Sequence, residues 1–257
     1  MTLEVFPVQA TKKEGKFDIY NEIKKLVKEN GISLNEGDIL VISSKYISIS
    51  QGRILDHNSI KLSEKANELS REFSINRKLS EAIVRESDVV FGGVSGFVIT
   101  SSNNIMAPNA GIDKSNSQGK LILYPNEPYQ VAEQIKRKFF LDYHLHVGII
   151  IVDSRLMPAR IGTSGVAIAC SGIEPVSDRR ATKDLDGNVL KVTFQATADN
   201  LASIANHKMG EGDELLPIVI IRESGAKLTD RRISSEETAI PYDECVYVRG
   251  LKKEYII

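Results

Sequence analysis

Three runs dominated by apolar residues occur along the chain, at 38–43 (DILVIS), 147–152 (VGIIIV) and 216–222 (LPIVIIR). A short continuous run of this kind, without alternating polar positions, is typical of a strand buried on both faces. Residues 3–9 predict a further strand at the start of the chain. These segments indicate a central sheet.

Other segments repeat their apolar positions with the period of a helix. Residues 17–30, 125–141 and 198–208 show this spacing, and Gly210 follows the last of them as a cap. The charged segment 59–87 predicts two helices separated near Ser74. Helices therefore alternate irregularly with the predicted strands.

The remaining strand candidates are shorter. Residues 88–100 and 104–107 predict a hairpin, and 163–169 and 189–197 predict two further strands, with short strand-like pieces at 244–249. Together with the helices they indicate an α+β or mixed α/β protein, and we expect α+β with mixed or antiparallel sheets and flanking helices, although the order of the strands stays open.

Composition excludes several classes. The 257 residues are 42% hydrophobic and 26% charged, with a net charge of −1, so no overall field attracts nucleic acid or an anionic membrane. The two cysteines form no disulfide framework or zinc motif. The apolar runs are far shorter than the roughly 20 residues that span a bilayer. We expect a cytoplasmic protein without a signal peptide.

Three acidic positions lie at the predicted ends of elements. Asp153 and Ser154 follow the 147–152 run, Asp113 stands three residues before Asn116, and Glu211 lies between two glycines. Carboxylate and hydroxyl oxygens suit Mg²⁺ or Mn²⁺. Each position has a plainer interpretation, as a turn cap, an Asx-rich turn or a solvated acidic loop.

The residues Ser43, Ser44 and Lys45 end the 38–43 run with two hydroxyls and an ammonium group, which suit phosphate oxygens. An ordinary polar strand end is the alternative. The sequence contains neither GxxxxGK[ST] nor GxGxxG, so any nucleotide must use an unconventional site. Taken together, the acids and this cluster favour metal-assisted phosphoryl transfer.

Several motifs in fixed order resemble the coenzyme F420-0:L-glutamate ligase family, also called F420:γ-glutamyl ligase. The resemblance runs from residue 3 to 223 and leaves 224–257 as a C-terminal extension, which we expect to pack on the same domain. Its motifs are EVFPVQ, DILVISSKYISISQGR, APNAGIDKSN, VGIIIVDSRLMPARIGTSGVAIACSGIEPVSD, KDLDGNVLKVT and KMGEGDELLPIVIIR.

The resemblance implies an intertwined homodimer and a reaction. A carboxylate of F420-0 attacks the γ-phosphate of GTP to form an acyl phosphate, and the amine of L-glutamate then displaces phosphate. A second glutamate can follow by γ-linkage. The implied cations are two divalent ions, Mg²⁺ or Mn²⁺, with K⁺ as a further candidate.

The resemblance also assigns roles to residues of this chain. It implies nucleotide binding by the segment 207–214, and catalytic roles for Asp153, Lys45 and Arg160. The implied metal ligands are Asp113, Asp153, Ser154 and Glu211. The implied nucleotide contacts are Ser43, Ser44, Lys45, Asn116, Gly210 and Gly212.

One segment departs from the family pattern. Many members read DTxGRxxRxG after the metal aspartate, whereas this chain reads DSRLMPARIG over 153–162. Arg160 and Gly162 are kept, Leu156 and Met157 replace a Gly-Arg pair, and an arginine stands at 155. The altered segment 155–159 therefore keeps open an amide ligase acting on another carboxylate-bearing cofactor such as a pterin. A second alternative, a non-catalytic nucleotide- or cofactor-binding homologue, predicts that a metal acid is missing, whereas Asp113, Asp153 and Glu211 are all present.

Overall fold

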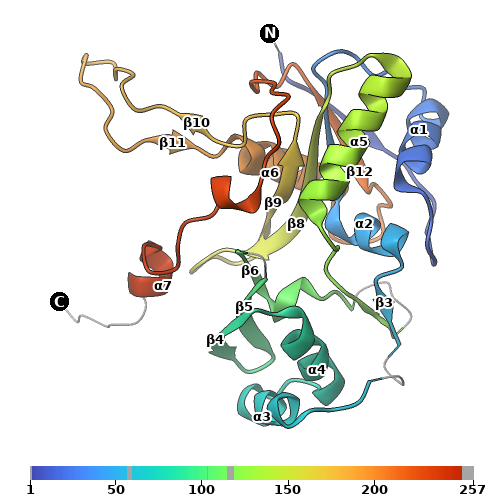
Figure 1. Cartoon of the computed structure of the whole chain (residues 1–257), viewed down its shortest axis with the longest axis vertical. Helices are drawn as coiled ribbons and strands as arrows, with labels where there is room; N and C mark the ends of the chain where they lie inside the picture. The colour runs from blue at the N-terminus through green and yellow to red at the C-terminus, as the bar shows by residue number, and fades with distance from the viewer. Residues whose placement is uncertain (1, 57–59, 103, 115–118, 251–257) are drawn as a thin grey trace.

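The computed structural model describes residues 2–56, 60–102, 104–114 and 119–250. Figure 1 shows a main body built on one large sheet, a smaller lobe below it, and a long arm that projects from the body. The class is α+β with mixed sheets, as the sequence predicts.

The main body is organised around five strands in the order β1-β12-β2-β8-β9. Of these pairings, β2 with β8 is parallel and the others are antiparallel. The three apolar runs are confirmed as its central strands. The bounds are β1 Glu4–Val8, β2 Ile39–Ser43, β8 Gly148–Leu156, β9 Thr163–Ser171 and β12 Ile218–Arg222.

Alternate residues of the central strands enter two separate cores, because successive side chains of a strand point to opposite faces. In β8, Ile149 and Ile151 pack on one side, whereas Ile150 and Val152 pack on the other. Within the described residues, three helices cover the first side and one covers the second. The covering helices are α1 Ile19–Glu29, α2 Ser44–Gln51 and α5 Pro128–Tyr143 on the first face, and α6 Thr197–Met209 on the second.

Helix α6 approaches the sheet closely. Its buried face carries Ala198, Ala202 and Ala205, and it packs on β9 where Gly165 has no side chain. A Cβ added at Gly165 would lie 2.6 Å from the Ala202 carbonyl oxygen. Small residues on both partners therefore set the position of this helix.

The smaller lobe packs helices α3 Glu64–Phe73 and α4 Arg77–Glu86 against a three-stranded sheet, and the helix break at Ser74 is confirmed. The segment 88–100 is not one strand, because the chain turns at Gly96 between β4 and β5. The three strands of this sheet are β4 Val89–Val94, β5 Phe97–Ser102 and β6 Ile105–Pro108. A separate short pair lies between the lobe and the body and consists of β3 Ile54–Leu55 and β7 Leu121–Ile122.

The arm corrects another strand prediction. Within it, β10 Ser177–Asp178 pairs with β11 Phe194–Gln195, and Lys183 forms one isolated bridge with Val189, so 189–197 is not a continuous strand. Leu185 is 106% exposed and Val192 is 84% exposed. The alternating apolar residues of this segment thus find no core to bury them within one copy of the chain.

The tail after β12 follows the body and then reaches the smaller lobe (Figure 1). Ile233 is buried beside α6, and Arg231 pairs with Glu174 at 2.6 Å. Further on, the Tyr242 ring stacks edge-on against Phe91 of β4 at 5.1 Å. The tail contains the one-turn helix η3 Ser235–Glu237 and α7 Val246–Gly250, so the prediction of strands at 244–249 is wrong.

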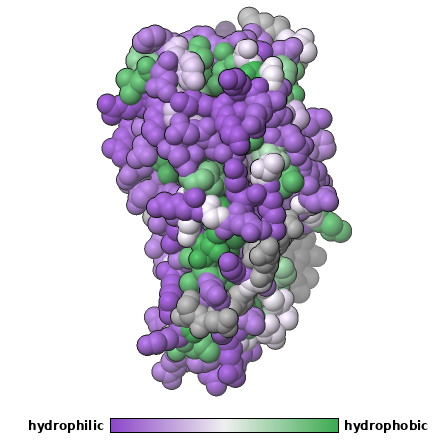
Figure 2. All heavy atoms as spheres, turned by 90° about the vertical axis from the view of Figure 1, so that its right-hand side faces the viewer, coloured by the Kyte–Doolittle hydropathy of each residue, from purple (hydrophilic) through white to green (hydrophobic). Residues whose placement is uncertain are grey.

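The visible surface in Figure 2 is mostly hydrophilic, with an apolar patch where the body meets the smaller lobe. Across the part of the chain that the structure describes, no helix has the length and hydropathy needed to cross a membrane.

Candidate active site

The junction of β2 and α2 lies beside the end of β8. Ser43 pairs with Val152 in parallel register, which places the next residues of both segments, Ser44 and Asp153, side by side. The Ser44 hydroxyl donates to Asp153 Oδ1 at 2.7 Å. Ser44 is also the first residue of α2, so the carboxylate lies near the positive end of a helix dipole.

The neighbouring residue reaches the second acid. Lys45 Nζ lies 2.7 Å from Asp113 Oδ2. Asp113 is fixed by two backbone hydrogen bonds of 2.9 Å with Ile122. Two consecutive residues at the start of α2 therefore bring together Asp113 and Asp153, which are 40 positions apart in the sequence.

A strained turn precedes Asp113. Asn109, Ala110 and Gly111 all have positive φ values, of 49°, 57° and 67°. For residues other than glycine, such angles cost on the order of 1–3 kcal/mol and persist only where the surroundings hold them. The Asn109 side chain accepts a hydrogen bond from the Val98 backbone at 3.0 Å and so helps to hold this turn.

A second cluster forms around Glu211, in the loop after α6. Its Oε1 atom accepts hydrogen bonds from Ser154 at 2.6 Å, from Thr163 at 3.0 Å and from Asn206 at 3.1 Å. The donors come from β8, β9 and α6, so the sheet and the helix together fix this carboxylate. Gly210 caps α6 with a φ of 73°, and the Gly212 backbone donates to Glu214 at 2.8 Å.

The two clusters lie on opposite faces of β8. Asp153 points toward α2 and Ser154 toward α6, because neighbouring residues of a strand alternate. Among the described residues, no three His, Cys, Asp or Glu side chains form a group that could hold a metal. The oxygen donors nevertheless suit a hard cation that keeps waters or takes phosphate oxygens as further ligands. The metal assignments stay predictions.

Two side chains that sequence reasoning left without a role also belong to this site. Arg155 donates through Nη1 to Asp153 Oδ2 and through Nη2 to the Tyr124 hydroxyl at 2.9 Å. Burial raises the pKa of Tyr124 above its ordinary value, so the phenol stays neutral at physiological pH. Thr163 and Asn206 were missed in the same way, since only the folded arrangement brings them to Glu211.

Of the two remaining predicted residues, the structure describes only Arg160. Arg160 is exposed in the turn between β8 and β9, and within the described segments no hydrogen bond or ion pair links its side chain to Asp153. Asn116 lies outside the described residues. Their predicted roles stay predictions.

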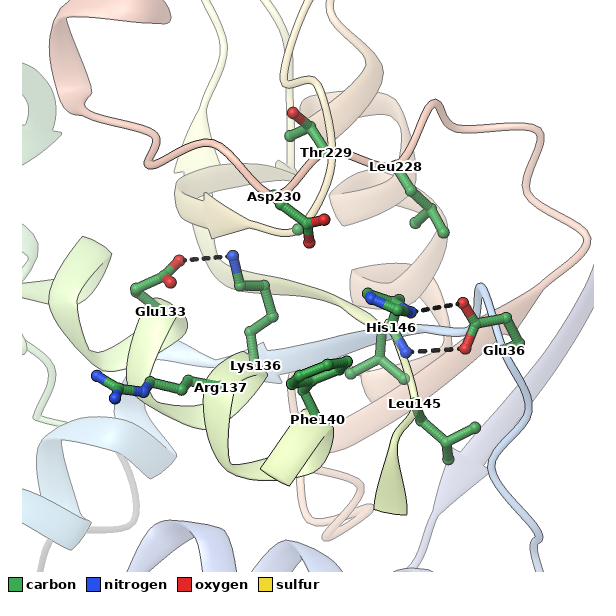
Figure 3. Close-up of a pocket in the computed structure, with 12 residues that line it drawn as sticks. Glu36, Glu133, Lys136, Arg137, Phe140, Leu145, His146, Leu228, Thr229 and Asp230 are labelled. Carbon is green, nitrogen blue, oxygen red and sulfur yellow. Dashed lines mark hydrogen bonds and ion pairs between the residues drawn. The ribbon is translucent and has the colours of Figure 1, made fainter. Parts of the chain in front are cut away.

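A cavity of about 470 Å³ lies at the opposite end of the central sheet (Figure 3). It adjoins the start of β8, about 20 Å along the strand from Asp153 at about 3.3 Å per residue. Two of its bases have acidic partners, Lys136 with Glu133 at 3.0 Å and His146 with Glu36 at 2.9 Å. None of the predicted site residues lines it.

Comparison with known proteins supports the family seen in the motifs. The family model for F420-0:Gamma-glutamyl ligase matches residues 10–223. A coenzyme F420:L-glutamate ligase of Methanocaldococcus jannaschii is 36% identical over 83% of this chain and 86% of its own length. Proteins of the same name from Methanopyrus kandleri and Archaeoglobus fulgidus are 34% and 33% identical over 86% of this chain, and over 87% and 88% of their own lengths. The chain therefore belongs to the F420-0:gamma-glutamyl ligase family.

Proposed function

We propose that this protein is a ligase that adds L-glutamate to the terminal carboxylate of coenzyme F420-0, with GTP as the phosphate donor. The relatives' names support the acceptor and the amino acid. The observation that carries the chemistry is the start of α2, where Ser44 and Lys45 reach Asp153 and Asp113. Acids beside a lysine and a helix N-terminus suit the transfer of a phosphoryl group.

The proposed reaction has two steps. A carboxylate oxygen of F420-0 attacks the γ-phosphorus of GTP, so that an acyl phosphate forms and GDP leaves. The amine of L-glutamate then attacks the acyl carbon, loses a proton and expels phosphate. A second glutamate can follow by the same two steps: a second GTP phosphorylates the γ-carboxylate of the glutamate already attached, and the amine of the second glutamate then displaces that phosphate.

The chain's own residues would orient the phosphates. Lys45 provides a point charge for phosphate oxygens, and the backbone N–H groups of the first turn of α2 donate to them. Asp113, Asp153, Ser154 and Glu211 would hold Mg²⁺ or Mn²⁺, with K⁺ as a further cation. When bound, the divalent ions neutralise the charge of the β- and γ-phosphates.

We further propose that two copies of the chain associate. The arm carries exposed apolar residues, namely Leu185, Val189, Val192 and Phe194. Apolar side chains on a projecting hairpin suit burial against a second copy. Light scattering after size-exclusion chromatography should give twice the 28.4 kDa mass of the chain, and a monomeric mass would contradict the proposal.

The reaction is tested with purified protein, GTP, Mn²⁺ and L-glutamate, with and without F420-0. We expect GDP release that depends on F420-0, and a product heavier by one or two glutamyl residues in the mass spectrum. Asp153→Asn is the matched inactive control. GDP release without a glutamylated product would contradict the acceptor, and a panel of other carboxylate-bearing cofactors, pterins included, would then identify it.

A further inference from the structure

Arg155 is the buried basic side chain next to the candidate metal acids. It is 5% exposed and lies two positions after Asp153 on β8, on the same face of the sheet. Its guanidinium pairs with Asp153 Oδ2 on one side and with the Tyr124 hydroxyl on the other. Asp153 thus already has a cationic partner.

The surroundings are shaped to fit this guanidinium. Its central carbon lies 5.4 Å from the centre of the Tyr124 ring, in stacking range. On the other side, a Cβ added at Gly111 would lie 2.5 Å from the Tyr124 ring and 3.6 Å from Arg155 Nη1. Glycine at 111 therefore leaves room for the arginine and the tyrosine.

The arginine is nevertheless incompletely satisfied. Among the described residues, its Nε atom is buried and has no hydrogen-bond partner. A buried donor without a partner is unfavourable, and a guanidinium has five N–H groups to place. This arrangement favours a second state in which the guanidinium bonds to an additional acceptor.

Charge indicates what that acceptor is. Arg155 neutralises Asp153, and Lys45 neutralises Asp113 at 2.7 Å. A divalent ion that approaches either acid must compete with a base that is already in place. An anionic ligand that binds at the same time gives the displaced base a new partner, so the two ligands should bind cooperatively.

We propose that Arg155 is an exchangeable counter-ion of Asp153. It pairs with the carboxylate when the site is empty. It moves to an anionic oxygen of the ligand, a phosphate or a carboxylate, when a divalent ion takes its place. The site then binds metal together with the anionic ligand and binds metal alone only weakly. This inference rests on the proposed function, because it takes Asp153 as a metal ligand.

The first test measures the affinity for Mn²⁺ alone by calorimetry. We expect Arg155→Met to bind Mn²⁺ about tenfold more tightly than the wild type, within the usual range of coupled binding. Arg155→Lys keeps the charge and should stay near the wild type, as should Arg71→Met, whose arginine is exposed on α3. Affinities of Arg155→Met and wild type within twofold, or no Mn²⁺ binding by either, would overturn the proposal.

The second test uses the wild-type protein and does not depend on the stability of Arg155→Met. The NMR signal of the Arg155 Nε–H, assigned by its loss in Arg155→Lys, should move when Mg²⁺ is added together with GDP or with L-glutamate. GDP provides the phosphate and L-glutamate the carboxylate, so the two additions separate the sources. A signal that moves with neither, or that moves fully with Mg²⁺ alone, would overturn the proposal.

The two proposals can fail separately. If the wild type makes the glutamylated product but Arg155→Met binds Mn²⁺ no more tightly, the counter-ion role is wrong and the ligase function stands. If Arg155→Met binds Mn²⁺ more tightly but the wild type makes no product, the ligase function is wrong and the counter-ion role stands.

Discussion

Replacing Gly165 by alanine tests whether the close contact between α6 and the sheet holds the Glu211 cluster in place. The added Cβ would lie 2.6 Å from both the Ala202 carbonyl oxygen and Asn206 Cβ, whereas ordinary contacts begin at 3.4 Å. The helix must therefore retreat by about 0.8 Å, or the strand must yield. Overpacking of this kind costs about 1–3 kcal/mol.

The expected thermal shift follows from the size of the chain. For a protein of this length, each kcal/mol lowers the melting temperature by about 2–4 °C, so we expect a decrease of about 2–12 °C. Asn206 moves with the helix and would draw away from Ser154 and Glu211. A misplacement of this size near a reacting group can reduce turnover by as much as about 100-fold.

Calorimetry and the GDP-release assay measure the two effects. Gly15→Ala is the matched control, because nothing lies within 4 Å of its added Cβ and its φ is not positive. The control should melt and react like the wild type. If Gly165→Ala also melts within about 1 °C of the wild type and turns over normally, α6 does not approach the sheet as described and the reasoning fails.

Three further predictions concern charged groups. Asp153→Asn should abolish turnover in the GDP-release assay, and normal turnover would contradict the site. It should also lower the free energy of unfolding in denaturant titrations by about 1–3 kcal/mol, because it leaves Arg155 buried without its carboxylate partner. Lys45→Ala should raise the KM for GTP in steady-state kinetics by roughly 10- to 100-fold, which corresponds to the free energy of one hydrogen bond to a charged group. An unchanged KM would mean that the phosphates bind elsewhere. The hydrogen bond from Arg231 holds the pKa of Glu174 below its ordinary 4.5. The stabilisation of the tail is therefore complete above that pH and is lost as the pH falls through the lowered pKa. Relative to an unfolded reference substrate at the same pH, cleavage of the tail by an acid-active protease should accelerate below about pH 4.5, and Arg231→Met should already show the fast cleavage at about pH 5–6, where the wild-type tail is still held.

Much of the central sheet could be predicted because its signal is local. The run at 147–152 contains only Gly, Val and Ile, so both faces of this segment had to be buried whatever it paired with. Helix α1 is similar, since Asp18 caps it by accepting from the Asn21 backbone and its apolar residues repeat at helical spacing. Strand order carries no such local signal.

Helix α2 was missed for a physical reason. Its sequence, SKYISISQ, contains an aromatic and two β-branched residues that intrinsically favour strands. The helix forms because Tyr46 and Ile47 are buried in the core beneath α1 and α5. Tertiary packing here overrides local preference. The same principle explains 189–197, whose alternating pattern indicated a strand although no layer of the same chain covers it.

The site was predictable by residue type but not by pairing. Asp113, Asp153 and Glu211 could be singled out as acids at element ends, yet only the parallel register of β2 and β8 shows that Ser44 meets Asp153. The separation of Asp153 from Ser154 could have been inferred, because adjacent strand residues face opposite ways. The contact of Arg155 with Tyr124 spans 31 positions and required the fold.

The contacts of Arg155 show where the departure from the family pattern at 155–157 places its cation. Positions 155 and 157 share a face of an extended chain, so an arginine at 155 instead of 157 keeps the charge on that face and moves it about 6.6 Å toward Asp153. Leu156 and Met157, 47% and 43% exposed, then present an apolar surface at the end of the strand. An acceptor bound at this turn would meet these two apolar side chains together with the exposed Arg160.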